Sequence, residues 1–138
     1  MSEIPLPRPT PLSQPHWDGC REGRLRIQRC GGCGRAVFIP QPLCPACHST
    51  GLAWIDCSGR GSLYSYTVVH RPQRPEFAAP YVVAIVELDE QPGLRLTTNL
   101  VGDTSPDPIG TRVQVEFVEA DGIWLPLFAP VPAAATKT

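Results

Sequence analysis

Two Cys-x-x-Cys motifs constrain the fold of this 138-residue chain more than any other feature. Cys30 and Cys33 form the first motif, Cys44 and Cys47 form the second, and ten residues separate them. Four thiolates at this spacing can close a tetrahedral metal site, because each tight turn presents two sulfurs to one point while its backbone N–H groups stabilise their charge. Zinc suits such soft ligands, and iron in a rubredoxin-like centre is the chemical alternative. The motifs therefore predict a segment that folds around a metal ion.

The four cysteines also predict what the metal does. Four sulfur ligands fill the coordination sphere of zinc and leave no open position for water, so we expect one structural zinc ion and no metal-based catalysis. His48 follows the last cysteine, at a position where such turns usually carry glycine. With four sulfurs available, we expect His48 to be an exposed turn residue and not a fifth ligand.

Two further cysteines, Cys20 and Cys57, lie outside the set. We expect both to be buried as small apolar residues, with a disulfide between them as the alternative. The N-terminus has neither the basic start nor the apolar stretch of a secretory signal, which indicates a cytoplasmic protein. A reducing cytoplasm disfavours the disulfide and favours metal binding by paired cysteines.

Composition narrows the fold class. With 17 proline and 12 glycine residues, a long helical bundle is excluded. A hydrophobic content of 42% against 18% charged residues is typical of a folded chain, and no apolar run is long enough to span a bilayer. The charge is uneven: residues 1–74 carry nine Arg and four acidic residues, whereas residues 75–138 carry three basic and nine acidic residues.

The chain divides into four parts by its local patterns. Residues 1–15 contain five prolines and predict an extended arm without a core of its own. Residues 16–57 combine a short amphipathic helix, expected over 16–26, with the two cysteine motifs. Residues 58–130 predict a barrel, and the alanine-rich tail 131–138 should fray.

The barrel prediction rests on five short strand patterns separated by turn signals. Alternating or continuously apolar segments, with no helical pattern between them, favour a five-stranded OB-fold, although an SH3-like barrel or an open sandwich would give a similar pattern. Because one segment is apolar on both faces, we expect the ribbon or a partner to cover its second face. The strands are expected at 62–70, 81–88 (the segment apolar on both faces), 94–101, 111–118 and 123–128.

The order of these parts resembles a known family. A short helix, a rubredoxin-like zinc ribbon with four cysteines and a five-stranded OB-fold barrel resemble the zinc-ribbon OB-fold proteins grouped as domain of unknown function 35. The resemblance covers about residues 16–130 and departs at His48, Cys20 and Cys57. It rests on Trp17-Asp18-Gly19, the two cysteine motifs, Ser58-Gly59-Arg60-Gly61 before Tyr64-Ser65-Tyr66-Thr67, Pro80-Tyr81-Val82-Val83 and Asp121-Gly122.

The resemblance implies a specific function. Members of the family accompany thiolase-like acyltransferases, aldolases and enoyl-CoA hydratases in acyl-CoA metabolism, including steroid side-chain degradation. By this resemblance the chain is an accessory subunit of a hetero-oligomer, and a CoA thioester is a ligand that it shares with its partner. A fold alone would not support this function.

The residues agree with a non-catalytic role. The sequence has no Gly-x-Ser-x-Gly motif and no phosphate-binding loop, so we expect no catalytic residues and no turnover by the isolated chain. Three arginines, Arg60, Arg71 and Arg74, are candidates to contact the 3′-phosphate and diphosphate of CoA, because a few guanidinium groups suffice for these charges.

Single-stranded nucleic acid binding is the alternative function. An OB-fold would need exposed aromatic residues among basic ones. Tyr64 and Tyr66 are expected to share one face, near Arg60, Arg71 and Arg74. The acidic second half of the chain provides no positive surface of the kind that dominates nonspecific binding. Nucleic acid is therefore the weaker hypothesis.

Overall fold

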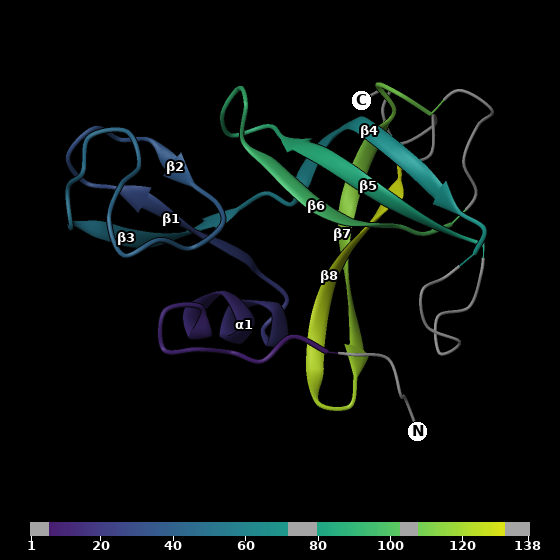
Figure 1. Cartoon of the computed structure of the whole chain (residues 1–138), viewed down its shortest axis with the longest axis horizontal. Helices are drawn as coiled ribbons and strands as arrows, with labels where there is room; N and C mark the ends of the chain where they lie inside the picture. Colours follow the sequence, from purple (N-terminus) through teal and green to yellow (C-terminus); the bar gives the residue numbers. More distant parts are fainter. Residues whose placement is uncertain (1–5, 72–79, 103–107, 132–138) are drawn as a thin grey trace.

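The computed structural model describes residues 6–71, 80–102 and 108–131. Within them the chain forms one helix, a three-stranded sheet in the order β2-β1-β3, and a closed barrel in the order β4-β5-β6-β8-β7. Figure 1 shows the three-stranded ribbon beside the barrel, and α1 packs against both β1 and β8. The elements are α1 (Gln14–Arg21), β1 (Leu25–Cys30), β2 (Ala36–Val37), β3 (Leu52–Cys57), β4 (Arg60–Val69), β5 (Tyr81–Leu88), β6 (Arg95–Leu100), β7 (Arg112–Ala120) and β8 (Ile123–Pro130).

The helix is shorter than the sequence pattern predicts. It ends at Arg21, and the expected extension to residue 26 is wrong. Gly23 adopts a left-handed conformation with φ of 79°, which stops the helix, and the Arg24 N–H then donates to the Gly19 carbonyl at 2.8 Å. Leu25 is the first residue of β1, and its side chain is buried as part of the sheet and not on a helix face.

The ribbon and the barrel share one hydrophobic core. β1 pairs with β3 over its full length, from Leu25 opposite Cys57 to Cys30 opposite Leu52. The inward side chains of Leu25 and Ile27 belong to the same buried cluster as the barrel core, in which Phe128 is fully buried. The chain therefore folds as two units that bury apolar surface against each other.

The five predicted strands of the barrel are confirmed, with changes of a few residues at their ends. β5 has the expected bounds, and the barrel closes where β4 pairs with β7 from Arg60 opposite Gln114 to Ser62 opposite Arg112. β6 meets β8 as a parallel pair at Leu100 and Phe128. A closed five-stranded barrel with this Greek-key order is an OB-fold, and the open sandwich is excluded.

The second face of β5 is only partly covered. Ala84, Val86 and Leu88 are buried in the barrel, whereas Val83 and Ile85, which alternate with them along the strand, remain partly exposed. The ribbon does not cover this outer face as fully as the continuous apolar pattern suggests.

A turn of the barrel holds the ribbon in place. The side chain of Gln91, between β5 and β6, accepts a hydrogen bond from the Ala36 N–H at 2.9 Å and donates to the Ala36 carbonyl at 3.2 Å. The neighbouring Glu90 accepts the Ser58 N–H at 2.7 Å. These bonds join the polar backbone of the ribbon to the barrel, beside the shared core.

None of the described helices is long and apolar enough to cross a membrane.

Gly61 of the barrel is predicted not to tolerate a side chain. A Cβ at Gly61 would overlap the Glu87 carbonyl oxygen and lie 2.9 Å from the Val86 Cγ1, so Gly61→Ala should lower the free energy of unfolding by about 3 kcal/mol through overpacking. Gly93→Ala is the control, because Gly93 has φ of 81° but no atom within 4 Å of its Cβ position; it should cost only about 1 kcal/mol. Urea denaturation measures both, and equal losses would contradict the packing argument.

Candidate metal centre

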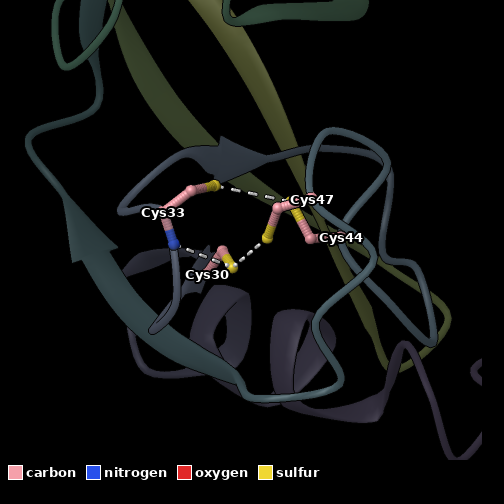
Figure 2. A group of neighbouring side chains, drawn as sticks. All are labelled: Cys30, Cys33, Cys44 and Cys47. Atoms are coloured by element: carbon pink, nitrogen blue, oxygen red, sulfur yellow. Dashed lines mark hydrogen bonds between the residues drawn. The ribbon is translucent and has the colours of Figure 1, made fainter.

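The four cysteines of the two motifs converge on one point. Their Sγ atoms all lie within 4.8 Å of one another, with Cys30 and Cys47 at 3.5 Å and Cys33 and Cys44 at 3.7 Å. Figure 2 shows the two motifs facing each other across this cluster. A zinc ion bound at about 2.3 Å to four sulfurs places neighbouring sulfurs about 3.8 Å apart. The donor set and its spacing therefore fit a tetrahedral tetrathiolate site.

The backbone of each motif makes the same turn. The Gly34 N–H donates to the Cys30 carbonyl, and the His48 N–H donates to the Cys44 carbonyl, both at 2.8 Å. Gly34 and His48 are both left-handed, with φ of 78° and 65°. His48 is exposed and does not belong to the sulfur cluster, so its predicted place as an exposed turn residue is confirmed.

Backbone N–H groups aimed at sulfur favour the thiolate form. Cys30 Sγ accepts hydrogen bonds from the Cys33 N–H at 3.4 Å and the Gly32 N–H at 3.3 Å. These bonds, that of Cys33 above all, lower the pKa of the Cys30 thiol to about 6. The N–H groups of Cys47 and Ala46 likewise lower the pKa of the Cys44 thiol. Each motif thus supplies a sulfur that is prepared for metal coordination.

The two remaining cysteines, Cys20 and Cys57, lie outside the sulfur cluster. Cys20 on α1 is fully buried, as predicted, whereas Cys57 at the end of β3 is only partly buried. Burial raises the pKa of each thiol to about 12. Both are free thiols in the structure, so the alternative of a Cys20–Cys57 disulfide is not realised there.

The three candidate CoA-binding arginines do not form one cluster. Arg60 begins β4 and Arg71 follows its far end, and a ten-residue strand is about 30 Å long. Arg60 lies near Asp89, the carboxylate that pairs with Arg112. Arg74 lies outside the described residues. One diphosphate therefore cannot contact both Arg60 and Arg71.

The prediction that Tyr64 and Tyr66 share one face of β4 is wrong. The register of β4 against β5 shifts between Leu63 and Ser65, so that Tyr66 lies opposite the buried Ala84. Tyr64 instead packs under the Arg95 guanidinium, whose Cζ is 3.8 Å from the ring centroid. This bulge places the two rings on opposite sides of the strand, so they do not form a stacking platform for nucleic acid.

Comparisons with known proteins agree with both halves of the structure. A family model described as "ChsH2, rubredoxin-like zinc ribbon domain" matches residues 17–53, and one described as "ChsH2, C-terminal OB-fold domain" matches residues 54–118. A solved chain of the "Ltp2-ChsH2(DUF35) aldolase" is 40% identical, with a TM-score of 0.81 over 91% of this chain and 98% of that chain. The chain belongs to the DUF35 family.

Other relatives of this DUF35 chain differ in length. It is 44% identical over 117 residues to a "Probable enoyl-CoA hydratase alpha subunit" of Thermomonospora curvata, covering 83% of this chain but only 36% of that protein. It is 43% identical over 97 residues to a "DUF35 domain-containing scaffold protein" of Methanothermobacter thermautotrophicus, covering 68% of this chain and 70% of that protein. The DUF35 chain thus spans about a third of the hydratase subunit and most of the scaffold protein.

Zinc binding by the DUF35 ribbon can be tested at an exposed ligand. We expect one zinc per purified chain and loss of this zinc in Cys47→Ser, because three sulfurs leave the tetrahedral site incomplete. Structural zinc contributes on the order of 10 kcal/mol to small sites, so the variant should also lose the ribbon fold. Elemental mass spectrometry and circular dichroism provide the readouts. Cys57→Ser is the control and should keep its zinc, and an unaltered fold with half the metal would refute a structural role.

Proposed function

We propose that this chain is a non-catalytic accessory subunit. It binds a thiolase-superfamily acyltransferase or aldolase, or an enoyl-CoA hydratase, and it supports the binding of the acyl-CoA substrate. The observation that carries the proposal is the match to the Ltp2-ChsH2(DUF35) aldolase chain, since it extends over nearly the whole of both chains at 40% identity. The relative named as a hydratase alpha subunit supports the same role.

The geometry of the metal centre supports a structural part for the ribbon. Four sulfurs would occupy every position of a tetrahedral ion, which leaves none for a substrate oxygen. The buried imidazole of His16 on α1 also has a structural partner, since its Nδ1 lies 2.9 Å from the Arg26 carbonyl oxygen and donates to it. These groups hold the fold and leave the chemistry to the partner.

The outer face of β5 is our candidate for the partner surface. Val83 and Ile85 project from it and are only partly covered, and Tyr64 on the adjacent β4 is 49% exposed. Partly exposed apolar and aromatic side chains on a rigid sheet are typical of protein interfaces. Contact with an enzyme subunit would complete the burial that the apolar pattern of β5 requires.

For the CoA phosphates, we propose Arg71 together with Arg74. Arg71 is exposed at the end of β4, and Arg74 follows three residues later in the sequence. Arg60 is left out of this contact, because it lies at the other end of the strand. The acyl group, a steroid side chain included, is set by the partner in this proposal.

Partner binding can be tested by co-expression with a thiolase-like, aldolase or hydratase gene from the same operon. We expect the two chains to elute as one gel-filtration peak, with activity on acyl-CoA that neither chain shows alone. Val83→Asp, on the outer face of β5, should split the peak because it places a charge in the apolar interface. Two peaks for the unaltered chains, with a fully active enzyme, would contradict the proposal.

The CoA contact can be tested in that complex. Arg71→Gln should raise the KM for acyl-CoA about fivefold and leave kcat nearly unchanged, because a phosphate contact far from the reacting atoms contributes to binding only. Arg60→Gln is the matched control and should change KM less than twofold. Steady-state kinetics measure both. The assignment fails if the two variants behave alike.

A further inference from the structure

A cavity of about 430 Å³ opens where the helix, the ribbon and the barrel meet. Its walls come from α1, the segment after β2, and the facing parts of β6 and β8, and Pro7 and Arg8 of the N-terminal arm complete its rim. Figure 1 shows α1 beside the lower part of β8, with which it is in contact. The volume falls within the range of about 300 to 1,000 Å³ that is usual for small-molecule sites.

The cavity lies beside the shortest strand pairing of the closed barrel. β6 and β8 pair only at Leu100 and Phe128. Beyond that pair the strands separate, and one side-chain bond from Thr98 Oγ1 to the Pro126 carbonyl, at 2.8 Å, joins them. The gap is lined by Leu96 on one strand and by Leu125 and Leu127 on the other, so its inner surface is mainly apolar.

One wall of the cavity is held rigidly. The His16 imidazole donates to the Arg26 carbonyl at 2.9 Å, and its ring lies 4.8 Å from the Trp17 ring and 5.4 Å from the Phe38 ring. These three rings are fixed by a hydrogen bond and by one another. The cavity is therefore preformed, which lowers the entropic cost of filling it.

The mouth of the cavity carries one positive charge. Arg8 is exposed on the rim and makes no ion pair within the part of the chain that the structure describes. Ile39, another lining residue of the cavity, is 66% exposed, so apolar surface reaches the solvent at this site. Apolar walls below a single guanidinium are complementary to an alkyl chain that ends in a carboxylate.

We propose that this cavity binds an amphipathic carboxylate. The alkyl chain enters the gap between β6 and β8, and the carboxylate stays at the mouth against Arg8. Such a site is separate from the proposed CoA contact at Arg71, and it needs no partner subunit, so the isolated chain suffices to test it.

The test is calorimetric titration of the zinc-loaded full chain with the sodium salts of hexanoic, octanoic and decanoic acid. We expect one molecule per chain and about fourfold tighter binding for each added methylene, since each buries a further increment of apolar surface. Octan-1-ol, which lacks the charge, is titrated in parallel. Affinity that does not depend on chain length would overturn the proposal.

Two pairs of variants locate the ligand. Arg8→Gln should weaken octanoate binding about threefold and leave octan-1-ol unaffected, whereas Arg35→Gln, another exposed arginine, should change neither. Ile39→Asp should abolish binding of both compounds by placing a charge in the mouth. Ile109→Asp is its control, because Ile109 is 51% exposed and lies outside the cavity. Equal effects within either pair would place the ligand elsewhere and refute the assignment.

Discussion

The convergence of four cysteine sulfurs is the constraint on which the rest of the ribbon depends. Between the end of β1 and the start of β3, most side chains are exposed, and only Ala36, Val37 and Cys44 are fully buried. So little apolar burial cannot offset the conformational entropy that is lost when the segment between β1 and β3 becomes ordered. A metal ion bound by the four sulfurs would supply the missing stabilisation, and the left-handed residues Gly34 and His48 let each turn close tightly enough to present them.

The ribbon in turn contributes side chains to the core of the barrel. Leu25 and Ile27 of β1 enter the core that contains Phe128, and Gln91 at the turn between β5 and β6 bonds both backbone groups of Ala36. Loss of the metal would therefore loosen the barrel as well as the ribbon, because the two share buried surface and directional hydrogen bonds. The same coupling keeps α1, β6 and β8 at a fixed separation around the cavity that they line.

Several features could be predicted from local patterns because their physical causes are local. The cysteine spacing predicts the sulfur cluster, and strict alternation in residues such as Val113 and Arg112 predicts β7 with its inner and outer faces. The predicted helix was too long because the apolar spacing of Leu25 fits a helix face and a strand face equally well. Only the left-handed turn at Gly23 and the pairing of β1 with β3 decide between them.

The sequence by itself determined the clustering of four cysteines and the number of barrel strands, since these follow from residue types at short spacing, and its motifs carried the resemblance to the family. Tertiary structure alone decided which distant residues meet. A bulge in β4 separates Tyr64 from Tyr66, and the length of β4 separates Arg60 from Arg71. The divergence of β6 from β8 opens a cavity that no sequence motif predicts. Register shifts, strand bending and barrel closure depend on pairing between segments far apart in the chain, so short-range patterns alone do not determine them.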